Sequence, residues 1–137
     1  MRYLGTIVAL SISVPASAAD QFDLVCSGKI HYLAARDKFE KNDVFSMELR
    51  VDLKAKQYCY ETCPSVIPIF NADGQNIEFE ESYENDPVYG TKGHRVSRVT
   101  GEYSTYNFPA GGGLSSDWKG SCEVAPFKGF PSPQTKF

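Results

Sequence analysis

Four cysteines are the residues of this sequence with the clearest chemistry: Cys26, Cys59, Cys63 and Cys122. Disulfide bonding, zinc binding and thiol redox exchange are all open to them. Redox motifs of the thioredoxin type have two residues between the cysteines, whereas three separate Cys59 from Cys63. A zinc site would need further ligands at a regular spacing, and none accompanies this pair. We therefore expect structural disulfides.

Chain geometry favours the pairing Cys59–Cys63 with Cys26–Cys122. A disulfide needs Cα atoms about 4.4–6.8 Å apart, and an extended chain would separate Cys59 from Cys63 by about 13 Å. The short bridge therefore requires a turn between them, and Pro64 directly after it supports one. The long bridge would then join the start of the folded part to its end. The other connectivities stay open at this point.

The two histidines, His31 and His94, are the remaining candidates for acid–base or metal chemistry. The ordinary pKa of histidine lies near neutrality, so His94 could serve as a general base. Neither histidine has a partner at a metal-ligand spacing, and the sequence contains no nucleophile-elbow or zinc-protease motif. We expect no metal, no cofactor and no catalytic residue, although an enzyme of unidentified class stays an alternative.

The elements that must position these residues begin after an N-terminal export signal. Arg2 precedes an apolar run, Pro15 ends the run, and residues 16–18 are small. This order is typical of a cleaved secretory signal peptide, and the run is too short to cross a membrane. Export in turn provides the oxidising compartment, periplasmic or extracellular, that disulfides need.

Three parts therefore follow one another along the chain. We assign residues 1–18 to the signal peptide and residues 19–125 to one β domain. Residues 126–137 contain several prolines and phenylalanines, and we expect them to form an extended tail.

Charge and hydropathy exclude two classes of partner. The formal net charge is −3 at pH 7, whereas general nucleic-acid binding depends on an excess of lysine and arginine. After the signal, no run reaches the roughly 20 apolar residues of a membrane-spanning helix. We therefore expect neither a nucleic-acid partner nor a membrane span.

Alternation of apolar and polar residues with period two predicts an all-β domain. The clearest case covers residues 45–53, in which every second residue from Phe45 to Leu53 is apolar. Shorter runs of this kind lie between turn signals. We expect about eight antiparallel strands in a meander, closed into a small lipocalin-like barrel or folded into a sandwich. Residues 80–93 are expected to form a long loop.

Several segments together resemble a group of small exported proteins of Gram-negative bacteria. They include residues 22–28 (FDLVCSG), 98–101 (RVTG), 120–122 (GSC) and the ending 126–137. Tyr58 stands where tryptophan is commoner in that group. The resemblance covers nearly the whole mature chain and implies a periplasmic location. It implies no activity and no functional residue.

A shorter stretch resembles the periplasmic inhibitors of C-type lysozyme, which are exported antiparallel β barrels with a cysteine near each end. Their inhibitory surface includes a Tyr-x-x-Lys-Gly stretch, and residues 89–93 have this form, with Tyr89 and Lys92 at the key positions. The companion Ser-Gly-x-x-Tyr loop of those inhibitors has no counterpart here. The resemblance implies a binding loop, and we take Tyr89, Lys92 and the nearby His94 as its candidate residues.

These observations favour a non-enzymatic binding module that recognises a protein or a small ligand of the cell envelope. Aromatic residues make up 13% of the chain, and aromatic side chains on a cross-linked scaffold support this interpretation. The alternatives are a lysozyme inhibitor acting through residues 89–93, a lipocalin-like carrier of an apolar ligand, and an enzyme. A hollow interior would favour the carrier, whereas a filled one would exclude it.

Overall fold

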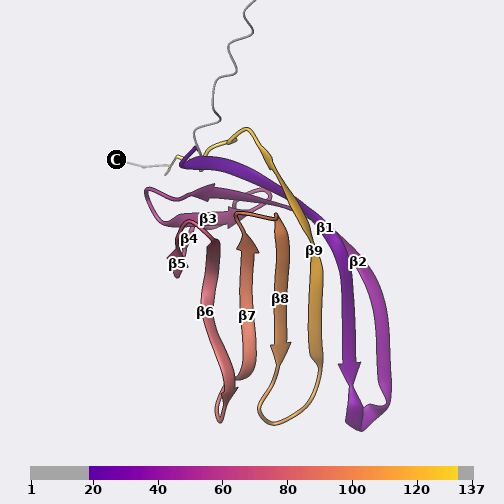
Figure 1. Ribbon diagram of the computed structural model, residues 1–137. Helices are drawn as coiled ribbons and strands as arrows, with labels where there is room; N and C mark the ends of the chain where they lie inside the picture. Colours follow the sequence, from indigo (N-terminus) through magenta and orange to yellow (C-terminus); the bar gives the residue numbers. More distant parts are fainter. Residues whose placement is uncertain (1–18, 133–137) are drawn as a thin grey trace, which may run out of the picture.

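Nine strands of this chain form one curled antiparallel sheet. The computed structural model describes residues 19–132, and the strands lie in the order β4-β3-β2-β1-β9-β8-β7-β6-β5 across the sheet. Figure 1 shows the long strands β1 and β2 arching from the upper left to the lower right, with β6 to β9 side by side within the arch. The all-β prediction is confirmed. The predicted signal peptide lies outside the described residues.

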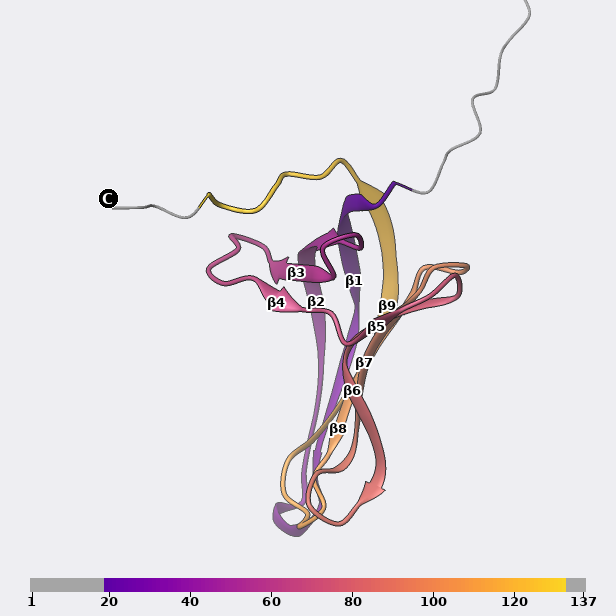
Figure 2. The same cartoon turned by 90° about the vertical axis from the view of Figure 1, so that its left-hand side faces the viewer.

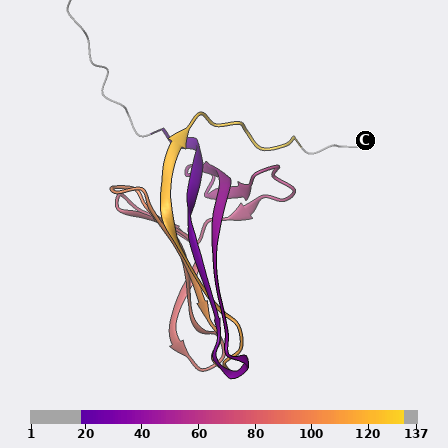
Figure 3. The same cartoon turned by 90° about the vertical axis from the view of Figure 1, so that its right-hand side faces the viewer.

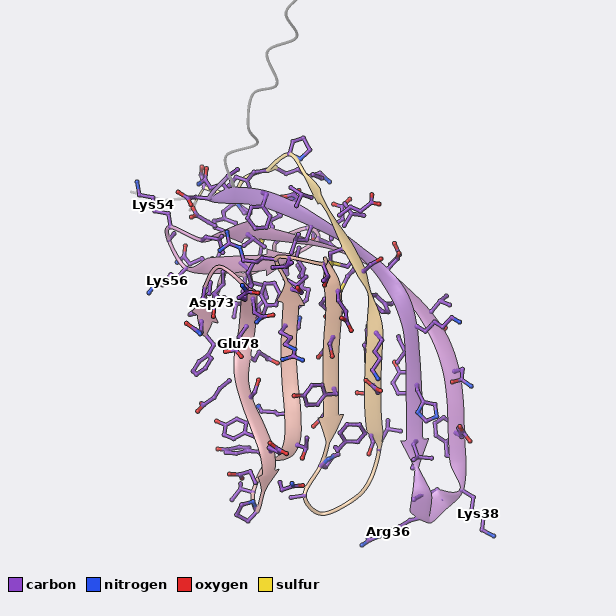
Figure 4. The ribbon with its side chains drawn as sticks, in the orientation of Figure 1. Arg36, Lys38, Lys54, Lys56, Asp73 and Glu78 are labelled. Atoms are coloured by element: carbon purple, nitrogen blue, oxygen red, sulfur yellow. A yellow bond between two sulfur atoms is a disulfide. The ribbon has the colours of Figure 1, made fainter. Side chains whose placement is uncertain are left out.

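The two longest strands form the first hairpin of the sheet. A short 3-10 turn, Ala35–Asp37, joins them, and Lys38 beside it has a left-handed backbone conformation with φ of 50°. Figure 4 shows Arg36 and Lys38 at the lower tip of this hairpin. The strands are β1 (Gln21–Ala34), β2 (Phe39–Asp52), β3 (Gln57–Tyr60), β4 (Ile67–Pro68), β5 (Asn71–Ala72), β6 (Asn76–Asp86), β7 (Gly90–Ser97), β8 (Glu102–Phe108) and β9 (Ser115–Ala125).

The alternation in the sequence places the core on the concave face of the sheet. In β2, Phe45, Leu49 and Val51 are buried, as the spacing of residues 45–53 predicts. Burying one such side chain stabilises the fold by about 1.5–3 kcal/mol. The other strands add buried residues in the same phase: Phe22, Leu24, Cys26, Ile30, Tyr58, Ile77, Phe79, Val96 and Tyr103.

Two facing glycines allow β1 and β9 to approach closely where the sheet curls. Gly28 pairs with Gly120 in the register of these strands. A Cβ atom on Gly28 would lie 2.1 Å from the carbonyl oxygen of Lys119, and one on Gly120 would lie 2.0 Å from that of Ser27. A side chain at either position would collide with backbone, so this crossing depends on glycine.

The sheet closes at its upper end and stays open at its lower end. Residues 67–72 cross between its two edges. The Ile69 amide donates to the Lys56 carbonyl at 2.9 Å, and the Phe70 amide donates to the Phe79 carbonyl at 3.4 Å. Figures 2 and 3 show β3 and β4 at this upper end, beside the long strands. The architecture is therefore a half-barrel, a small curled sheet that is closed at one end only.

Residues 80–93 form paired strands, so the prediction of a long loop there is wrong. They belong to β6, β7 and the turn between them. The two strands pair through register shifts between Glu78 and Glu80, between Glu80 and Tyr83, and between Tyr83 and Asp86. Each shift interrupts the alternation by which a strand is recognised in a sequence.

The described part of the tail, residues 126–132, contains neither helix nor strand and contacts the convex side of the sheet. The Lys128 ammonium forms an ion pair with Glu48 at 2.6 Å. The Arg50 guanidinium donates to the carbonyl of Gly129 at 2.8 Å. These contacts hold the start of the tail against β2.

Candidate functional site

The register of the long strands arranges side chains in rows across the concave face. Residues directly opposite each other on neighbouring antiparallel strands point to the same face. Following these pairs from β2 through β1, β9, β8 and β7 to β6 gives a middle row of Asp43, Ile30, Trp118, Thr105, His94 and Glu80.

The rows above and below the middle row differ in polarity. The row above is almost entirely apolar: Phe45, Gly28, Gly120, Tyr103, Val96 and Ile77. The row below is mostly polar: Lys41, Tyr32, Ser116, Asn107, Lys92 and Tyr83. The middle row therefore lies at the boundary between the core and the open end of the half-barrel.

A hollow of about 640 Å³, called the groove below, opens along the middle row. This volume lies within the range of roughly 300–1,000 Å³ that is usual for small-ligand sites. Its lining combines the aromatic side chains of Phe45, Tyr60 and Trp118 with the polar side chains of Thr105, His94 and Glu80.

His94 is deeply buried at the inner wall of the groove, at 3% exposure. The hydroxyl of Tyr103 lies 2.9 Å from its Nε2, and the hydroxyl of Tyr60 lies 3.5 Å from its Nδ1. The Tyr60 ring stacks on the imidazole with an interplanar angle of 11°, and the Phe79 ring packs beside it with a centroid distance of 4.7 Å. The imidazole is thus fixed by groups from three other strands.

Burial lowers the pKa of His94 from 6.5 to about 4, because desolvation penalises the charged imidazolium. The Glu80 carboxylate lies 3.9 Å from Nδ1 and would favour a charged ring, but its side chain is 58% exposed and water screens it. Desolvation prevails, so His94 is uncharged at neutral pH. The same desolvation raises the pKa of Tyr103 well above its usual range, so this hydroxyl keeps its proton.

The candidate residues of the stretch 89–93 do not project from the sheet as a loop. Tyr89 lies in the turn before β7, and Lys92 lies within β7 on the concave face. The Lys92 ammonium is 5.1 Å from the centre of the Tyr83 ring and 5.5 Å from that of Tyr89, a cation–π arrangement. Tyr89 and Lys92 are brought together, while His94 lies one row higher. The lysozyme-inhibitor hypothesis stays a prediction.

Both predicted disulfides are present. Cys26 and Cys122 are directly opposite each other on β1 and β9. Cys59 and Cys63 have Cα atoms 5.0 Å apart, because the chain turns back after β3 with a positive φ of 37° at Glu61. The cysteines therefore act as cross-links of the scaffold that carries the groove.

A second hollow, of about 400 Å³, lies at the upper end of the concave face. Its lining is chiefly apolar and includes Phe22, Leu24, Ile77 and Val96. The interior is therefore not filled, and the alternative of an apolar-ligand carrier stays open.

The other candidate histidine is a surface group. His31 lies 2.8 Å from Glu40, and both side chains are well exposed. Within residues 19–132, no group of three or more His, Cys, Asp or Glu side chains is placed to hold a metal ion. Over the same range, no helix combines the length and the apolar composition that crossing a membrane requires.

Fold and site together define a class of protein: a disulfide-linked antiparallel half-barrel with an aromatic groove at its open end. Comparisons with protein-family models, with curated proteins and with solved structures found no match. The resemblance to small exported proteins therefore stays a hypothesis. The function of the groove has to be argued from its own chemistry.

Trp118, Thr105 and Tyr60 are groove residues that the sequence does not single out. They lie on separate strands, and an isolated tryptophan in a strand is usually a core residue. One signal is present in the sequence, since Thr105 and His94 occupy inward positions of their strands, next to the buried Tyr103 and Val96. A polar residue in the buried phase of an alternating strand is the feature to look for.

Proposed function

We propose that this protein is an exported, non-enzymatic binding module whose ligand occupies the groove. The observation that carries the proposal is the gathering of an indole, a phenol and an uncharged imidazole around one open hollow. Trp118 and Tyr60 offer flat apolar surfaces, while His94 and Thr105 offer hydrogen-bonding groups. Apolar walls with a few convergent polar groups are the usual composition of ligand sites.

The surroundings of His94 support a role in orienting a ligand. Its Nε2 is already engaged by Tyr103, whereas the nearest partner of Nδ1, the Tyr60 hydroxyl, is at the long distance of 3.5 Å. A buried nitrogen with so weak a partner is well placed to bond a hydroxyl or carbonyl group of a ligand. Because the ring is uncharged at neutral pH, the ligand need not carry a charge at this point.

Export is supported by two independent features. The N-terminal sequence has the order of a signal peptide, and the two disulfides indicate an oxidising compartment. We place the protein in the periplasm or outside the cell, where a covalently linked sheet keeps a ligand site in shape.

Trp118 is the single tryptophan of the chain, so its fluorescence reports on the groove. We expect a fragment library screened by ligand-observed NMR to yield hits that shield Trp118 from acrylamide quenching. Thr105→Phe fills the groove from β8 and should lower the affinity for these fragments about tenfold or more, because the new ring takes the space of the ligand.

Ser104→Phe is the matched control. Ser104 precedes Thr105 on β8, and successive residues of a strand point to opposite faces, so the added ring lies on the convex side. This variant should leave the hits and the shielding unchanged. Fragments that bind Thr105→Phe as tightly as the unchanged protein would contradict a ligand site in the groove. A screen without any fragment that shields Trp118 would contradict it as well.

A further inference from the structure

The outer edge of the lower half of β2 has no strand beside it. β3 pairs with β2 only between Leu49 and Asp52, and the Glu61 amide donates the next bond, to the Glu48 carbonyl, at 2.8 Å. Within the described residues, no strand continues along positions 39–47 on that side. Alternate backbone groups in this stretch are therefore left without a partner strand.

Two hydrogen bonds show which backbone groups face the open edge. The Glu48 carbonyl points to the β3 side. In a strand, the N–H and C=O groups of every second residue point to the same side, so those of Asn42, Val44 and Ser46 also point to the β3 side. The Val44 amide agrees with this, since it donates to the carboxylate of Asp43 at 2.8 Å. A side chain thus occupies the place that a partner strand would take.

Hollows adjoin this edge along most of its open length. Separate hollows touch positions 42–44, 44–47 and 46–48, and the middle one is the groove. A chain laid along the edge therefore passes the groove, into which one of its side chains can point.

The rim of the groove carries an acidic group that lacks a cation. Among the described residues, the basic group within ion-pair distance of Glu80 is His94, which is uncharged at neutral pH. The two lysines of the row below are engaged elsewhere, Lys41 with Asp43 at 3.0 Å and Lys92 with two tyrosine rings. An incoming lysine or arginine would find Glu80 free to pair with it.

We propose that the open edge of β2 binds an extended segment of a partner polypeptide. The segment pairs with Asn42, Val44 and Ser46, places an aromatic or large aliphatic side chain in the groove, and sets a lysine or arginine beside Glu80. The inference rests on the proposed function and identifies its ligand as a polypeptide strand. Main-chain bonds give such complexes affinity, and side-chain pockets give them selectivity.

Two features favour strand addition at β2 over other occupants and other edges. A sugar or a lipid fills a hollow but does not complete the alternating donors and acceptors of a strand edge. The pairing of β2 with β1 is regular from Phe39 to Asp52, whereas β6 carries register shifts, which blunt an edge.

The test uses the oxidised mature chain and random linear nonapeptides displayed on phage. We expect selected peptides to carry an aromatic or aliphatic residue close to a lysine or arginine. Val44→Pro removes an edge amide and leaves the ladder with β1 intact, a position at which proline is tolerated. For selected peptides made by synthesis, this variant should lower the affinity about tenfold or more. In a peptide bound as a strand, every second amide faces β2. N-methylation of that set of amides should lower the affinity likewise, whereas N-methylation of the other set should not.

Matched variants separate the parts of the proposal. Val44→Thr keeps the edge amide and should retain the affinity. Glu80→Lys should weaken the binding of basic peptides. Glu78→Lys makes the same charge change outside the groove and should leave their binding unchanged. Glu78 is labelled in Figure 4 and pairs with Arg95 in the register of β6 and β7.

The inference is overturned if the selection yields no peptide whose binding depends on Val44, or if the N-methylated peptides bind equally well in both phases. It is also overturned if sedimentation shows the free chain to be a dimer that Val44→Pro dissociates, since a second copy would then hold the edge. If fragments still shield Trp118 in such a case, the proposed function stands and strand addition alone fails.

Discussion

Replacing Cys26 and Cys122 together by alanine is expected to lower the free energy of unfolding by about 4–5 kcal/mol. This disulfide spans 96 residues of sequence, so it restricts the unfolded chain far more than the Cys59–Cys63 disulfide, which spans 4. The same chain-entropy reasoning gives about 2 kcal/mol for the short disulfide. Urea unfolding followed by Trp118 fluorescence in non-reducing buffer measures both losses.

The double variant Cys59→Ala/Cys63→Ala is the control for this prediction. It removes the same number of sulfur atoms and leaves β1 linked to β9. Equal losses of stability in the two double variants would show that the loop length does not determine the contribution. A larger loss in the control would point to the turn after β3 as the more important constraint.

Lowering the pH from 6.5 to 4 is expected to remove about 3 kcal/mol of stability through His94. The folded-state pKa of His94 is about 4 and the unfolded value is 6.5, so over this range the unfolded chain binds a proton that the folded chain does not. The stabilisation is complete above pH 6.5 and is lost as the pH falls toward 4. The lowered pKa of Asp52 acts in the same direction, but the stability it contributes is lost chiefly as the pH falls below about 4, at the acid end of this range.

His94→Gln should flatten this dependence, because glutamine does not titrate and can still hydrogen-bond the surrounding hydroxyls. His31→Gln is the control, since it removes the exposed histidine and should leave the slope unchanged. The measurement is the free energy of unfolding in urea at several pH values between 4 and 7. A slope that survives His94→Gln would mean that another group causes it.

Local alternation is enough to predict most of the strands. In β2, one face packs in the core and the other meets solvent, so every second residue from Phe45 onward is apolar. The Cys59–Cys63 disulfide follows from a similar local argument, because Cys63 can reach Cys59 only if the chain turns between them. These features depend on neighbours in the sequence, and the sequence therefore reveals them.

The opening of the half-barrel could not be predicted, because its causes are distant in the sequence. The close approach of β1 and β9 depends on Gly28 facing Gly120. The residues around either glycine give no sign that the two glycines pair. The register shifts of β6 hide a strand within an acidic stretch that is typical of a loop. Both features become visible only when the strands are paired.

One residue of the groove is among the candidates taken from the sequence. His94 is identified from its residue type, but its partners Tyr60, Tyr103 and Glu80 come from three other strands. Tyr103 on β8 is 2% exposed and its hydroxyl contacts the imidazole, a contact that no local pattern in the sequence indicates. A ligand site composed of single residues from many strands leaves no compact motif.

Amide hydrogen exchange in β2 tests most directly whether the edge beside the groove is open. In the free mature chain we expect the Asn42 and Ser46 amides to exchange quickly, because they face the open edge, and the Phe45 amide to exchange slowly, because it faces β1. The Arg50 amide is in phase with Ser46 but should be protected, since β3 covers it. Protection of Asn42 and Ser46 as strong as that of Arg50 would show that the edge is already occupied and would contradict the account.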